Sequence, residues 1–222
     1  MLRIGVPAGA EFVLLFFYIL IVYAIIRGFG PAAQAGFGVG ARVMQALFLP
    51  VVALSFAVSP VVGQNFGGRK ADRVRHSIYA GLAMASLLML VLACVTWLVP
   101  GHMIRFFSKD EHVITFGSDY LRIVAWNFIA AGLVFTSSSI FQGLGNTIPP
   151  LISSASRLLL FALPALLLSR SPGFEIRYVW YLSVGSQVLQ ASINLLLLRH
   201  ELHKKLKFEE GGDFLPASAV AD

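Results

Sequence analysis

Long runs of apolar residues, separated by short polar stretches, make up most of this chain. A helix that crosses a bilayer needs about 20 mostly apolar residues. Six segments meet that requirement: residues 6–26, 32–62, 78–99, 116–144, 148–169 and 179–198. The pattern therefore predicts an all-α integral membrane protein with six transmembrane helices. The polar, Gly-containing stretch 207–222 is expected to be a flexible tail.

Composition supports a membrane protein over a soluble one. Hydrophobic residues make up 57% of the 222 positions and charged residues only 13%, whereas a soluble domain carries about 25% charged residues. The net charge is +6. Because the basic residues stand at the ends of apolar runs, they indicate contact with membrane lipid rather than with nucleic acid.

The distribution of Lys and Arg predicts the orientation. With six spans, both termini share one side of the membrane, and nine basic residues fall on that side against five on the other. The nine are Arg3, Arg69, Lys70, Arg73, Arg75, Arg199, Lys204, Lys205 and Lys207. The positive-inside rule then places both termini in the cytoplasm, in a multi-pass protein of the plasma (inner) membrane. Trp97, Trp180 and Tyr181 fall near the outer interface, where amphipathic rings are favoured.

The stretch VVGQNFGGRKADRVRH, residues 61–76, nearly matches a phosphate-binding P-loop. Counting from Gly63, however, the Lys is one position late and the Ser or Thr is missing, so a nucleotide site is not supported. The alternative is a cytoplasmic loop between the second and third spans, with Gly63, Gln64, Asn65 and Gly67 as its motif. Glycine would permit a tight reversal of the chain there.

Catalytic chemistry is poorly supported. All five histidines fall in predicted loops or the tail, and His200 to His203 reads HExH rather than the zinc-binding HExxH. The single cysteine, Cys94, cannot form an intrachain disulfide or a Cys-rich metal site. We therefore expect no enzyme activity, no catalytic residue, no metal and no cofactor.

Polar residues inside membrane spans are costly, and each needs an explanation. Glu11 lies in the first span, and Tyr18, seven residues later, shares its helical face. One interpretation is an interfacial carboxylate near the membrane edge. The other is a proton or cation site, because a carboxylate beside an aromatic ring suits an organic cation.

Three further spans carry charged residues. Arg42, with Gln45 three residues on, either extends to the outer interface or forms a polar pair facing the bundle. Asp119 and Arg122 are spaced to form an ion pair. Arg157 is isolated in the fifth span and should face a watery cavity or a carboxylate from another helix.

The sixth span carries a polar stripe. Its members, Ser183, Gln187, Gln190 and Asn194, lie on one helical face. Such a stripe either holds helices together or lines an aqueous path. The two glutamines favour a path, so Gln187, Gln190 and Asn194 join Glu11, Tyr18, Arg42, Gln45 and Arg157 as candidate substrate- or cation-binding residues.

Four segments in order resemble one half of a MATE (multidrug and toxic compound extrusion) transporter. They are GVPAG at residues 5–9, GFGPAAQAGFGVGARV at 28–43, LPVVALSFAVSPVVGQNFGGRKADRVR at 49–75 and FQGLGNTIPPLISSASRLLLFALP at 141–164. The resemblance implies that residues 1–206 form the C-terminal six-helix lobe of a twelve-helix fold. In the branch of the family that couples through this lobe, the acid lies further from the helix-seven Pro than Glu11 lies from Pro7. The resemblance also implies that the Asp in helix ten of that branch aligns near Ala131 of this chain.

The resemblance implies efflux of small organic, often cationic compounds and drugs by antiport with protons or sodium. A homodimer or a separate N-terminal lobe would complete the transport path. The alternatives are a truncated fragment that does not transport and a lipid-linked saccharide flippase of the same superfamily.

Overall fold

The computed structural model describes residues 2–171 and 173–206, so the predicted tail at 207–222 lies outside the described residues. Five elements make up the first half of the chain. They are α1 (Leu2–Ile26), the 3₁₀ turn η1 (Arg27–Phe29), α2 (Pro31–Gly67), α3 (Ala71–Leu98) and the short α4 (Pro100–Arg105). The second half contains α5 (Glu111–Val124), the 3₁₀ turn η2 (Ala125–Asn127), α6 (Phe128–Gly143), α7 (Ile148–Leu168) and α8 (Ile176–Lys205).

The predicted all-α membrane fold is confirmed. Six apolar segments are long enough to cross a bilayer: α1 with η1, α2, α3, the α5–α6 segment, α7 and α8. No strand occurs among the described residues. The fourth span runs from Glu111 to Gly143 and includes the 3₁₀ turn η2, because α5 and α6 continue into each other.

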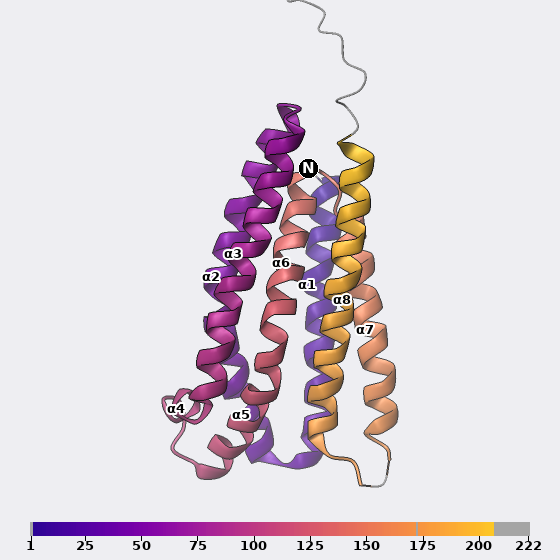
Figure 1. The fold of residues 1–222 in the computed structure, drawn as a ribbon. Helices are drawn as coiled ribbons and strands as arrows, with labels where there is room; N and C mark the ends of the chain where they lie inside the picture. Colours follow the sequence, from indigo (N-terminus) through magenta and orange to yellow (C-terminus); the bar gives the residue numbers. More distant parts are fainter. Residues whose placement is uncertain (1, 172, 207–222) are drawn as a thin grey trace, which may run out of the picture.

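The helices run nearly parallel in one elongated bundle (Figure 1). Helix α2 packs against α3, α5 and α6, while α7 packs against α1 and α8. Contacts between α6 and α8 join these two groups. The start of α1, the α2–α3 turn and the end of α8 lie at the same end of the bundle (Figure 1), which we call the terminal end.

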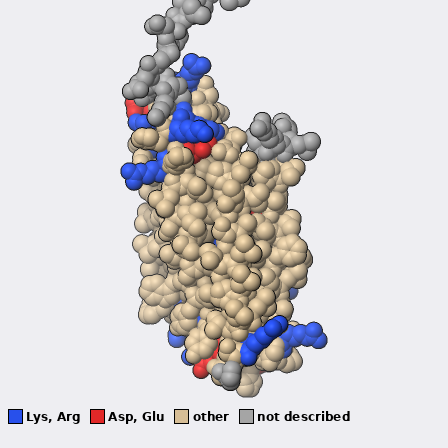
Figure 2. Space-filling view, turned by 90° about the vertical axis from the view of Figure 1, so that its right-hand side faces the viewer, with Lys and Arg blue, Asp and Glu red and all other residues tan. Residues whose placement is uncertain are grey.

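On the face that Figure 2 shows, charged side chains gather at the two ends of the bundle, and the broad band between them is almost free of surface charge. Large apolar residues in this band are exposed, including Phe12, Phe16, Leu87 and Leu163 at 58–64%. A surface of this kind is stable only against lipid or another apolar partner.

The motif Gly63, Gln64, Asn65 and Gly67 is not a loop, contrary to the sequence prediction. Helix α2 continues through Gly67, and only Gly68 to Lys70 connect it to α3. Arg69 takes the left-handed conformation (φ 52°) that ends the helix, and the Lys70 amide donates to the Asn65 carbonyl. Gly63 stays helical because it packs against α6, where an added Cβ would lie 3.1 Å from the Gly143 carbonyl oxygen.

Candidate functional site: a polar column between α1, α6, α7 and α8

Polar side chains from four helices meet inside the bundle. On α8, Ser183, Gln187, Gln190 and Asn194 are each at most 5% exposed. They lie between two apolar clusters, one around Trp180 and the other around Leu198. We call the polar column these α8 residues together with Glu11, Tyr18, Ser137, Ser138, Ser154 and Arg157.

Helix α1 contributes the acidic side chain. The Ser138 hydroxyl of α6 donates a hydrogen bond to Glu11 Oε2 at 3.2 Å. Glu11 Oε1 is buried and has no hydrogen-bond partner among the described residues. A carboxylate oxygen left unsatisfied inside a membrane bundle is costly, so it favours a proton, a cation or a water at this position.

Tyr18 contacts both α7 and α8. Its hydroxyl lies 2.7 Å from the Ser183 hydroxyl. The Arg157 guanidinium lies over its ring, with Cζ 4.7 Å from the ring centroid. No carboxylate of the described chain forms a salt bridge with Arg157, and its Nε is buried without a hydrogen-bond partner. Arg157 was expected to face a watery cavity or a carboxylate from another helix, and in the structure it packs on the electron-rich face of the Tyr18 ring.

The α8 stripe makes interhelical hydrogen bonds. The Gln190 amide donates to the Ser154 hydroxyl of α7 at 3.0 Å, and the Asn194 amide donates to the Ser137 hydroxyl of α6 at 3.3 Å. The stripe therefore joins helices. The oxygen of each amide nevertheless stays buried without a partner in the described structure. The column therefore contains two amide oxygens that are free to accept a hydrogen bond.

Two candidate residues do not join the column. Arg42 and Gln45 are both exposed on α2, so the proposed polar pair facing this bundle does not form. Asp119 also differs from the expectation, because it pairs with Arg177 of α8 at 2.6 Å instead of with Arg122. Helix α5 packs against α8, so a partner across the helix interface replaces the one along the helix.

The α6 hydroxyls were missed in the sequence analysis. Thr136 to Ser139 form a run of four hydroxyl residues within an apolar span, and all four are buried. Ser137 and Ser138 reach the column, while Thr136 lies 3.0 Å from Ser55 of α2. Such a run was a signal available in the sequence.

Comparison with known proteins identifies a family and several relatives of this chain. The MatE family model matches residues 7–167. The chain is 25% identical over 181 residues to the probable multidrug resistance protein YoeA of Bacillus subtilis, covering 81% of this chain and 39% of that protein. It is 23% identical over 206 residues to the multidrug export protein MepA of Staphylococcus aureus, covering 90% and 44%. The chain thus spans less than half the length of these relatives.

Solved structures show the same arrangement of helices. An outward-facing multidrug resistance MATE family transporter superposes with a TM-score of 0.85 at 18% identity, over 92% of this chain and 46% of that one. The Vibrio cholerae MATE transporter VcmN in its bent form gives 0.83 at 21% identity, over 92% and 46%. The six helices match one lobe of these transporters, as the sequence resemblance implied, and the chain belongs to the MatE family.

Proposed function

We propose that this chain forms one lobe of a secondary active transporter that exports small organic, often cationic compounds in exchange for protons or sodium. Membership of the MatE family supports this proposal, as do relatives named for multidrug resistance and export. The coupling ion is the only cofactor that the mechanism requires.

One observation carries the proposal at the level of residues. The Glu11 carboxylate has one hydrogen-bonded oxygen and one buried oxygen without a partner. It shares the column with the cation Arg157, yet the two form no salt bridge. An acid that is partly satisfied and not neutralised by a fixed partner can exchange a proton or a small cation.

The same charges that predict orientation support a plasma-membrane protein with cytoplasmic termini. The α2–α3 connection with the start of α3 and the end of α8 carry seven of the nine basic residues assigned to the cytoplasmic side, and both lie at the terminal end (Figures 1 and 2). The positive-inside rule then directs this end to the cytoplasm.

A second six-helix lobe, either another copy of this chain or a separate lobe, would complete the transport path. Helix α1 packs mainly on α7 and contacts α2 little. It therefore exposes Phe12, Phe16 and Phe17 to 50% or more, while α2 exposes Arg42 and Gln45. Arg42 and Gln45 would then be available to contact substrate at the surface of α2. Parallel lobes related by a two-fold axis along the membrane normal occur in transporters.

The test is ethidium efflux from cells that express the full chain, with Glu11→Gln as the variant. We expect efflux to be lost while expression and helicity are retained. Glu111→Gln is the matched control, because Glu111 is exposed and far along the chain from the column. Efflux that survives Glu11→Gln would exclude Glu11 from coupling. A wild-type chain that forms a stable assembly yet shows no efflux would favour a lobe that does not transport.

A further inference from the structure

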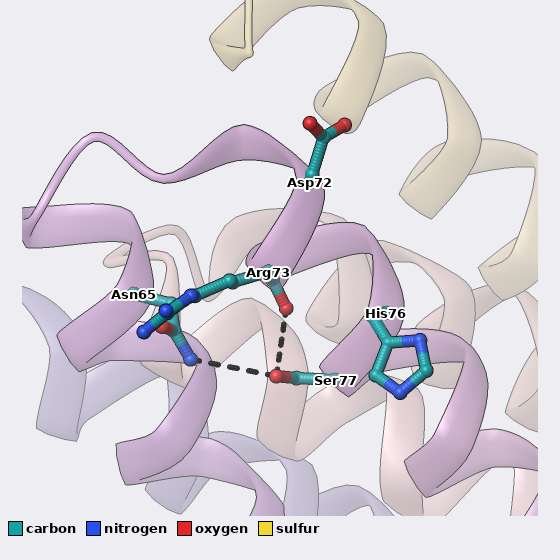
Figure 3. Close-up of a pocket in the computed structure, with 5 residues that line it drawn as sticks. All are labelled: Asn65, Asp72, Arg73, His76 and Ser77. Carbon is teal, nitrogen blue, oxygen red and sulfur yellow. Dashed lines mark hydrogen bonds between the residues drawn. The ribbon is translucent and has the colours of Figure 1, made fainter.

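The α2–α3 turn carries two cavities that belong to neither the polar column nor the proposed transport path. The first, of about 550 Å³, is lined only by polar residues: Asn65, Asp72, Arg73, His76 and Ser77 (Figure 3). The second, of about 330 Å³, is a largely apolar groove between α2 and α3. His76 and Ser77 line both, so the polar pocket adjoins the groove.

Each helix supplies one continuous stripe to this surface. On α3 the lining residues Arg73, His76, Ser77, Ala80, Gly81 and Met84 follow the helical spacing i, i+3, i+4, i+7, i+8 and i+11. Eleven residues of helix rise about 16 Å, roughly half the thickness of a bilayer core. The surface therefore changes from polar to apolar along the direction in which a lipid lies.

The α2 side completes the groove with Leu54, Ala57, Val58 and Val61. Helices α2 and α3 approach each other closely at the base of this groove. There Gly81 packs on Val58, and an added Cβ at Gly81 would lie 2.8 Å from Val58 Cγ2. Val61 and Met84 are 46% and 55% exposed. In a span of the membrane, open apolar walls of this kind contact lipid chains.

The polar pocket contains hydrogen-bond donor groups that have no partner. The Asn65 amide donates to the Ser77 hydroxyl at 3.4 Å, and that hydroxyl donates to the Arg73 carbonyl at 2.7 Å, which fixes the floor. Neither the Arg73 guanidinium nor the His76 ring has a hydrogen-bond or ion-pair partner among the described residues. The Asp72 carboxylate points away from Ser77 (Figure 3) and lies 3.9 Å from Arg75.

We propose that this surface binds one anionic phospholipid, with its phosphate at Arg73 and His76 and an acyl chain in the α2–α3 groove. Exposed Arg69 and Lys70 and the positive end of the α3 dipole add to the attraction. The charge and the apolar walls are complementary to the two parts of such a lipid. The proposal does not depend on transport activity.

Native mass spectrometry of the purified full chain tests it, with equal amounts of phosphatidylglycerol and phosphatidylcholine of the same chain length. We expect wild type to retain one phosphatidylglycerol at least about fivefold more than phosphatidylcholine. The double variant Arg73→Gln with His76→Gln should bind the two lipids equally. Arg199→Gln, which removes an exposed charge from α8 near the same end of the bundle and outside the pocket, should keep the preference.

A second variant tests the groove. Ala57→Leu with Ala80→Leu fills it without changing charge, and retention of phosphatidylglycerol should fall about tenfold while circular dichroism shows unchanged helicity. If the charge variant fails to fold, this variant decides alone, and unchanged retention would overturn the proposal.

Three other outcomes also overturn the lipid site. Equal loss in Arg199→Gln and in the Arg73/His76 variant would mean general charge attraction. Displacement by millimolar inorganic phosphate would mean a free-phosphate site. Retention by a monomer but not by a dimer would mean that protein covers the groove.

Discussion

The Arg157 guanidinium lies over the Tyr18 ring, 4.7 Å from its centroid, while the Tyr18 hydroxyl lies 2.7 Å from the Ser183 hydroxyl. A single tyrosine on α1 thus connects α7 and α8. Phe161 of α7 completes the contact, with its ring centroid 4.6 Å from that of Tyr18. Since α1 packs chiefly on α7, Tyr18 holds α1 in place beside the column.

The first prediction separates the contribution of the Tyr18 ring to stability from that of its hydroxyl. Tyr18→Phe keeps the ring under Arg157 but loses the hydrogen bond, and should destabilise the fold by about 1 kcal/mol. Tyr18→Ala also loses the ring and should cost about 3–5 kcal/mol. Unfolding of the purified chain in mixed detergent, followed by circular dichroism, measures both.

The cation–π contact itself is measured by a double-mutant cycle between Tyr18→Leu and Arg157→Met. We expect a coupling free energy of about 1–2 kcal/mol, because the guanidinium is desolvated. A coupling near zero would mean that Arg157 is held by something other than the ring.

The orientation gives a second prediction. In a Cys94→Ser background, which removes the exposed native thiol, Gln64→Cys lies at the terminal end and His112→Cys at the start of α5, near the opposite end (Figure 1). Both positions are exposed. A membrane-impermeant maleimide added to intact cells should label the His112→Cys variant alone. Labelling of Gln64→Cys without permeabilisation would reverse the orientation.

The sequence was sufficient to predict the six spans because apolar length is a property of each segment alone. It was also sufficient to place Ser183, Gln190 and Asn194 on one helical face. It could not say which helix each of them meets, since that depends on packing between segments far apart in the chain. Trp180 shows the same limit. The sequence predicted that its ring lies near the outer membrane interface. In the structure Trp180 is 2% exposed and stacks on Phe37, with 5.5 Å between the ring centroids.

The extent of α2 was mispredicted for a related reason. Glycine weakens an isolated helix, so Gly63 and Gly67 indicated a loop. Packing overrides this preference at Gly63, where α6 is so close that an added Cβ would lie 3.1 Å from the Gly143 carbonyl oxygen. The low helix propensity of glycine and the packing of α2 on α6 thus favoured different structures, and the sequence alone shows only the first.

A cluster at the terminal end gives the third prediction. Lys205 Nζ lies 3.1 Å from Glu201 Oε1 and 2.8 Å from the Leu144 carbonyl oxygen, and the Asn146 amide donates to the same Glu201 oxygen at 2.8 Å. Glu201 is 8% exposed. The cluster thus fastens the α6–α7 connection to the end of α8.

Removing only the cation leaves a largely buried carboxylate without its ion partner, so Lys205→Met should destabilise the fold by about 1–3 kcal/mol. Adding Glu201→Gln should recover part of that loss, because the charge is then gone. Lys204→Met is the control, since Lys204 is exposed and forms no salt bridge with Glu201 among the described residues. Equal stabilities of the Lys205 and Lys204 variants in a thermal unfolding series would show that the cluster contributes nothing.

The close approach of α2 and α6 gives the last prediction. A Cβ at Gly143 would lie 2.5 Å from the Ser59 carbonyl oxygen of α2, and this atom is backbone that cannot rotate away. Gly143→Ala must therefore push the two helices apart, which should destabilise the fold by about 1–3 kcal/mol. Gly67→Ala, in the last turn of α2 with nothing within 4 Å of its added Cβ, should be neutral or stabilising by up to about 1 kcal/mol. The difference between the two variants in detergent unfolding isolates the packing cost from the general effect of replacing glycine in a helix. If both variants shifted stability by the same amount, close packing would not be the reason for glycine at position 143.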